Sequence, residues 1–168
     1  MQTFSSMQRN SRDIYIVKSI VFFISILFYQ LLSSIYATIP PLIGLFFVYA
    51  VVLNYEKERS YQDYTHEWYQ VILYLFIAEQ MHGFELFSAA IAFGLFYYIF
   101  FEFSLDRIRF KTLFLIYLTI MGYLSVFLVS NTLSYFKDAE YLNFGVEYLA
   151  YMVVESLLVL FFFKGRIL

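Results

Sequence analysis

The chain of 168 residues contains no cysteine and few charged residues. Without cysteine it has no disulfide framework, no catalytic thiol and no cysteine-ligated zinc or iron–sulfur centre. Its net charge of −2 offers no basic surface for nucleic acid, so no nucleic-acid partner is expected. Histidine occurs only twice, and the nucleophile-elbow, zinc-protease and phosphate-loop motifs are absent. The sequence therefore predicts a protein that is not an enzyme and uses no cofactor.

Apolar residues dominate the composition instead. They make up 62% of the chain, charged residues make up 14%, and the mean hydropathy is +0.70. Soluble globular domains are about 45–50% apolar and about 25% charged, so a soluble protein is close to excluded. A spanning helix takes about 20 residues, so six spans would use about 120 residues and leave no room for a separate soluble domain. We expect residues 1–168 to form a single integral membrane domain.

Six apolar blocks follow one another along the chain, and each predicts a transmembrane helix. They cover residues 14–36, 39–55, 64–81, 84–103, 112–135 and 144–163. Pro40 and Pro41 open the second block. Proline is tolerated at a helix start because the N–H that it lacks has no intrahelical partner there. The fold class expected is all-α, a compact bundle of six transmembrane helices.

The distribution of lysine and arginine predicts how this bundle is oriented. If six spans begin in the cytoplasm, ten of the eleven basic residues lie on the cytoplasmic side and only Lys137 lies outside. Short loops rich in lysine and arginine stay on the cytoplasmic side of a membrane. We therefore expect a multi-pass protein with both termini in the cytoplasm.

Glu155 lies near the middle of the sixth block, where a charge is costly and is a functional candidate by default. Tyr151, four residues earlier on the same helix face, is a candidate hydrogen-bond partner, and Lys18 is a candidate ion-pair partner. Two interpretations stay open: a structural hydrogen bond between helices, or a charge that carries protons or binds a ligand. On the structural interpretation Glu155→Leu should change stability little, because an interhelical hydrogen bond averages about 0.6 kcal/mol.

A second polar cluster lies between the third and fourth blocks and contains Glu79, His82, Gly83 and Glu85. Gly83 allows a tight reversal because glycine adopts positive φ without steric cost. Two carboxylates and a histidine could act as an acid–base pair, but their spacing matches no standard metal-ligand motif. The cluster predicts a polar outer turn or a contact for a partner protein, and no metal site.

Small residues in the fourth block predict close helix packing. Ser88 and Ala92 form one pair at a spacing of four residues, and Ala90 and Gly94 form another. Such pairs let helix backbones approach closely in a membrane. They would serve either the internal bundle or a partner helix.

Three of these features occur together in one known family. The second block opens with Pro40 and Pro41 in residues 39–45, Glu79 is followed by a turn at Gly83, and Arg107 and Arg109 follow the fourth block. With this layout the chain resembles the rod shape-determining MreD family. It departs from the family in two places: aspartate is more common where Glu79 stands, and a small pair is more common at residues 86–88.

The resemblance implies a non-enzymatic scaffold subunit of the bacterial cell-elongation machinery, which maintains rod shape and lateral peptidoglycan synthesis. Such subunits lie in the inner membrane with MreC-like and other elongation-complex membrane proteins. The family fold is similar to the substrate-binding subunits of energy-coupling factor transporters, so a vitamin-type transporter subunit is the alternative. Those subunits commonly carry an Ala-x-x-x-Ala face in the first span, which residues 22–29 lack here.

Overall fold

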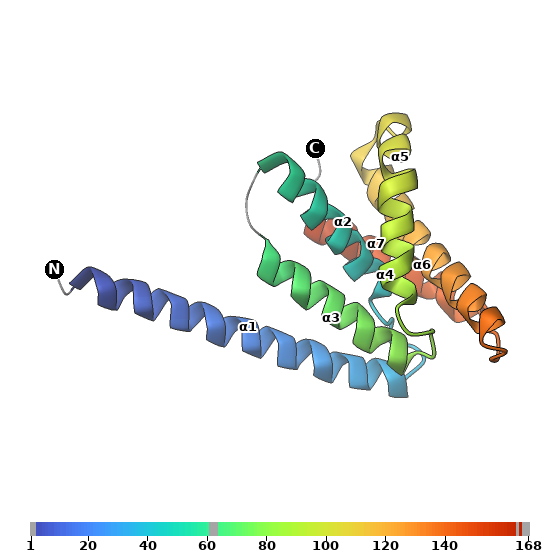
Figure 1. The fold of residues 1–168 in the computed structure, drawn as a ribbon, viewed down its shortest axis with the longest axis horizontal. Coiled ribbons are helices and arrows are strands. Elements are labelled where there is room, and N and C mark those ends of the chain that lie inside the picture. Colours follow the sequence, from blue (N-terminus) through green and yellow to red (C-terminus); the bar gives the residue numbers. More distant parts are fainter. Residues whose placement is uncertain (1–2, 61–63, 164, 166–168) are drawn as a thin grey trace.

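The computed structural model describes residues 3–60, 64–163 and 165, with side chains described at 17, 20–59, 64–163 and 165. Over these residues it is helical and contains no strand. The elements are α1 (Thr3–Ile35), α2 (Ile43–Ser60), α3 (Thr65–Met81), α4 (Ser88–Leu95), the π-helix η1 (Phe96–Phe101), α5 (Glu102–Arg107), α6 (Lys111–Phe136) and α7 (Val146–Phe163). Because α4, η1 and α5 follow one another without a break, the described residues form six helical rods (Figure 1).

The all-α prediction is confirmed, and the helix lengths support a membrane protein. Three rods among the described residues are long and apolar enough to cross a bilayer: Ser88–Arg107, Lys111–Phe136 and Val146–Phe163. In α1, the apolar segment among the described side chains is Ile20–Ile35, and it is shorter than these three rods. At 1.5 Å per residue, the 18 residues of α7 extend about 27 Å, close to the thickness of the hydrocarbon core.

Two helices inside the chain start later than predicted. The second helix begins at Ile43 rather than residue 39, and the fourth begins at Ser88 rather than residue 84. Pro40 and Pro41 lie in an irregular segment, because a proline pushes the residue before it toward extended backbone. Before the fourth helix, the left-handed Phe87 (φ 70°) ends the turn.

The core is built around α2 and α6. α2 packs against α3, α4, α6 and α7, and the side chains of Ile43, Phe47, Val48 and Val51 have no exposed surface. A helix that is apolar on every side is stable only when other helices surround it. α2 is therefore the central rod, and α3, α4, α6 and α7 cover it.

α1 is the least embedded rod. Its carboxyl-terminal part lies along α3, and the rest extends past the bundle (Figure 1). With 33 residues it is about 50 Å long, more than the thickness of a bilayer core. It begins at Thr3, well before the predicted start at residue 14.

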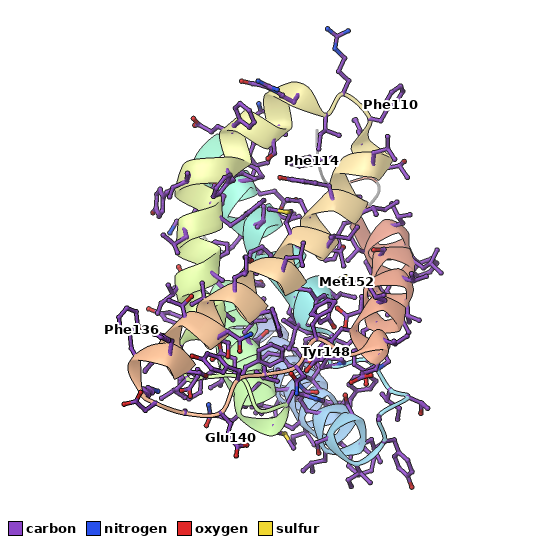
Figure 2. All side chains as sticks on the ribbon, turned by 90° about the vertical axis from the view of Figure 1, so that its right-hand side faces the viewer. Phe110, Phe114, Phe136, Glu140, Tyr148 and Met152 are labelled. Carbon is purple, nitrogen blue, oxygen red and sulfur yellow. The ribbon has the colours of Figure 1, made fainter. Side chains whose placement is uncertain are left out.

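The bundle has two distinct ends. Figure 2 shows α6 running obliquely between α4 and α7, with Phe110 at one end of the bundle and Phe136 and Glu140 at the other. We call these the Phe110 end and the Glu140 end. α2 and the α4–η1–α5 rod both finish at the Phe110 end, because Tyr55 of α2 contacts Phe101 at an inter-ring distance of 5.6 Å there.

Candidate functional site

The irregular segment between α1 and α2, residues 36–42, reaches deep into the bundle, and we call it the proline loop. α2 begins beside Glu155, which lies at the middle of α7. The proline loop therefore runs from the Glu140 end to about half the depth of α7. Irregular backbone at such a depth is tolerated in a membrane only where its polar groups are satisfied inside the protein.

Side chains from three helices satisfy the carbonyl groups of the proline loop. The bonds are Tyr151 Oη to the Ala37 carbonyl, Ser33 Oγ to Ile39 (3.0 Å), Tyr29 Oη to Pro40 (2.9 Å), Gln30 Nε2 to Pro41 (3.4 Å) and Tyr74 Oη to Pro41 (2.7 Å). Sequence reasoning singled out Tyr151, with a different partner, and missed the other four residues. The available signal was the group Tyr29, Gln30 and Ser33 on one face of an otherwise apolar helix that precedes two prolines.

Glu155 caps the amino terminus of α2 from α7. Its Oε2 accepts a hydrogen bond from the Leu45 N–H at 2.9 Å, and its Oε1 accepts one from the Tyr123 hydroxyl. The Leu42 and Gly44 amides also lie close to this carboxyl group, which is fully buried. The first N–H groups of a helix have no intrahelical acceptor and carry partial positive charge. A buried carboxylate at this point accepts hydrogen bonds from these N–H groups and offsets their positive charge.

Gly44 allows α2 to approach Glu155 closely. A Cβ at this position would lie 2.8 Å from the Tyr123 ring, 2.9 Å from the Thr119 methyl group and 3.0 Å from Glu155 Oε2. Only glycine lets the first turn of α2 meet α6 and α7 at this distance. The glycine and the glutamate therefore form one structural unit.

The partners expected for Glu155 need one correction. Tyr151 donates to the Ala37 carbonyl rather than to Glu155, and the tyrosine that bonds Glu155 is Tyr123 on α6. The i, i+4 spacing suggested Tyr151, but a contact between helices is invisible to local spacing. The side chain of Lys18 lies outside the described side chains, so its ion pair with Glu155 stays a prediction.

Glu79 caps α4 from α3 in the same manner. Its Oε1 accepts hydrogen bonds from Ser88 Oγ at 2.8 Å and from the Ala89 N–H, and its Oε2 accepts one from the Phe87 N–H at 3.1 Å. The Glu79 side chain is 1% exposed. The outer turn predicted from sequence is thus held by a buried carboxylate that bonds three donors.

The other residues of the predicted cluster take separate partners. Gly83 has φ +74°, as its role in the reversal required. Glu85 pairs with Lys137 Nζ at 2.5 Å, and His82 Nε2 lies 3.3 Å from Ser33 Oγ. Among the described residues, no group of three or more histidine, cysteine, aspartate or glutamate side chains could hold a metal ion. The structure therefore does not gather these residues into one site.

The two small-residue pairs of the fourth block behave differently. Ser88 and Ala92 have no exposed surface, and α4 packs on α2, α3 and α6. Ala90 is exposed, and a Cβ added at Gly94 would meet no atom within 4 Å. The first pair therefore serves packing inside the bundle, whereas the second makes no close helix contact within this chain.

Acidification is expected to destabilise the protein through His82, which lies just beyond α3. Burial lowers the pKa of His82 below its usual 6.5, because the imidazolium loses hydration. The unfolded chain then binds a proton that the folded chain excludes. Stability is complete above the unfolded pKa and falls as the pH drops below about 6.5. Thermal unfolding of the purified protein between about pH 7.5 and about pH 5 measures the slope of stability against pH.

A pair of variants isolates this histidine from the carboxylates that also titrate. His82→Gln should flatten the slope in this range, whereas His66→Gln, at an exposed position at the start of α3, should leave it unchanged. An identical slope in wild type and His82→Gln would show that the prediction is wrong.

The arrangement as a whole is a pair of buried carboxylates, each bonded to the first turn of another helix, beside a loop whose carbonyl groups are bonded by side chains. Both carboxylates are already engaged with donors of the protein itself. Their chemistry in this geometry is anchoring: each ties two distant parts of the sequence together. Comparison of the chain with protein-family models, with curated proteins and with solved structures finds no match.

Proposed function

We propose that the chain is a non-enzymatic scaffold subunit of the bacterial cell-elongation machinery, which maintains rod shape and lateral peptidoglycan synthesis. It lies in the inner membrane with six spans and both termini in the cytoplasm. Its partners are MreC-like and other elongation-complex membrane proteins. The sequence layout that resembles the MreD family and the distribution of basic residues support this proposal.

The observation that carries the proposal is an exposed stripe on α1. Six apolar residues are each more than half exposed and alternate at spacings of four and three residues: Val17, Val21, Ile24, Phe28, Leu31 and Ile35. A repeat of 3.5 residues is the spacing along which two helices pair with left-handed crossing. The stripe therefore matches the contact surface for a partner helix, as a scaffold subunit requires.

The two buried glutamates also favour a scaffold over a substrate-binding subunit. In transporters with broken helices, helix amino termini at the membrane midplane point at anionic groups of the substrate. Here Glu155 occupies that place at α2, and Glu79 caps α4 in the same way at the outer turn. The protein satisfies these helix ends with its own carboxylates.

A photo-crosslinking amino acid at Phe28 is expected to capture an MreC-like membrane protein in growing rod-shaped cells. Phe28 is 62% exposed and lies in the middle of the α1 stripe. The matched control is Phe161, which is 81% exposed on α7 and lies outside the stripe. Depletion of the protein should in parallel give rounded cells that lyse. Adducts are identified by mass spectrometry, and equal capture from both positions would contradict the assignment of α1.

The alternative, a subunit that binds a small molecule for transport, has one observation in its favour. The Gln30 Oε1 beside the proline loop is buried and has no hydrogen-bond partner among the described residues. Normal cell shape after depletion, together with specific loss of uptake of one vitamin, would establish this alternative and reject the scaffold.

A further inference from the structure

A groove of about 510 Å³ lies at the Phe110 end of the bundle, between the end of α2 and the η1–α5 segment. Its polar lining includes Tyr55, Glu58 and Arg59 of α2 and Tyr97, Glu102 and Asp106 of the other rod. This volume is within the range of small-molecule sites, about 300–1,000 Å³. The groove is separate from the proline loop and from both capping glutamates.

The groove carries more negative than positive charge. Three carboxylates face one guanidinium, that of Arg59, which stacks 4.6 Å from the centre of the Tyr55 ring. Glu102 and Asp106 are four residues apart on one helix face. Carboxylates that outnumber cations in a lining favour a ligand with a positively charged hydrogen-bond donor.

Two buried tyrosine hydroxyl groups on this groove have no hydrogen-bond partner among the described residues. Tyr55 is 9% exposed and Tyr97 is 6% exposed, and the Oη atom of each is unpaired. Glu58 and Asn54 lie close to the Tyr97 hydroxyl, so the Tyr55 hydroxyl is the group that most clearly lacks a partner. A buried hydroxyl without a partner is costly and rare in native proteins. These two groups therefore point to a ligand with hydrogen-bonding oxygens.

We propose that the groove binds the headgroup of an ethanolamine phospholipid. The groove lies at the last turn of Ser88–Arg107, a rod of membrane-spanning length, which is the level of lipid headgroups. The primary ammonium has three N–H donors, which the carboxylates of Glu102 and Asp106 on the same helix face can accept. The phosphate oxygens accept from Arg59 and from the tyrosine hydroxyl groups. The proposal does not depend on the scaffold function.

The headgroup specificity follows from this lining. A choline headgroup has a quaternary ammonium, which can rest on aromatic faces but cannot donate hydrogen bonds. The carboxylates therefore favour the primary ammonium over choline. An anionic glycerol headgroup would be repelled by the excess of negative charge.

Binding of three lipids with identical acyl chains to the purified full-length protein in detergent tests this proposal. Native mass spectrometry measures the binding of phosphatidylethanolamine, phosphatidylcholine and phosphatidylglycerol, and thermal unfolding measures the melting temperature with each lipid. We expect the ethanolamine lipid to bind about tenfold more tightly than the choline lipid, as one or two charge-assisted hydrogen bonds imply. The double variant Glu102→Gln/Asp106→Asn should lose this preference. Glu140→Gln, an exposed carboxylate at the opposite end, should keep it.

A second variant keeps the proposal testable if the double variant fails to fold. Tyr55→Phe removes only the unpaired hydroxyl, so it should weaken binding of the ethanolamine lipid and leave the melting temperature without lipid unchanged or higher. Equal affinity for the three lipids, or a preference for choline, would overturn the proposal. Free phosphoethanolamine that competes at the same concentration as the lipid would also overturn it, because the ligand would then be a soluble molecule.

Discussion

Replacement of Glu155 by leucine is expected to destabilise the protein by about 3 kcal/mol, because it leaves buried donors without an acceptor. The Leu45 N–H and the Tyr123 hydroxyl both lose their partner in the buried core of the bundle. Each buried donor without a partner costs about 1–3 kcal/mol. The purified protein is kept in a mild detergent, and a denaturing detergent is added stepwise. The unfolding curve gives the change in the free energy of unfolding.

This effect is larger than the sequence suggested. A single interhelical hydrogen bond averages about 0.6 kcal/mol, and on that basis Glu155→Leu should change little. The structure instead brings a helix amino terminus and a hydroxyl group to the same carboxyl group. Loss of the cap therefore releases the first turn of α2 as well as one side-chain contact.

Two further variants define the role of Glu155. Glu155→Gln keeps one acceptor oxygen but turns an NH₂ group toward a donor, so we expect an intermediate loss of about 1–2 kcal/mol. Glu147→Leu removes an exposed carboxylate from the first turn of α7 and should cost less than about 1 kcal/mol. Wild-type stability in Glu155→Leu would falsify the capping role.

Replacement of Glu79 by alanine is expected to cost about 2–3 kcal/mol and to loosen the start of α4. The Ser88 hydroxyl and the Phe87 and Ala89 N–H groups all lose their acceptor. Hydrogen exchange of the amide of Ala89 should accelerate more than that of amides in the middle of α6, because the uncapped turn opens locally. The free energy of unfolding and the exchange rates are measured on the same preparation.

Glu85→Ala is the matched control for Glu79, because it removes the same charge from the same turn. Glu85 is paired with Lys137, whose side chain is 53% exposed, and such pairs contribute about 0–1 kcal/mol. We therefore expect a loss below about 1 kcal/mol. If both variants were equally stable, the buried cap at Glu79 would contribute no more to stability than the exposed ion pair of Glu85.

The helix boundaries show how far local sequence reaches. The positions of the six rods followed from the apolar blocks, and Gly83 marked a true reversal. The starts at Ile43 and Ser88 did not follow, although Pro40 and Pro41 were visible. Proline excludes a helix interior but does not say whether a helix begins at it or after it.

Composition and periodicity by themselves determined that this chain is helical, with helices that suit a bilayer, and that Glu155 and Glu79 need a reason to lie among apolar residues. These conclusions depend on each residue and its near neighbours along the chain. Only the tertiary structure decided what the two glutamates contact. Each caps a helix that is not its own: Glu155 bonds Leu45, 110 residues away. The donors of a helix amino terminus can be satisfied from any part of the chain, so sequence spacing carries no record of which carboxylate satisfies them.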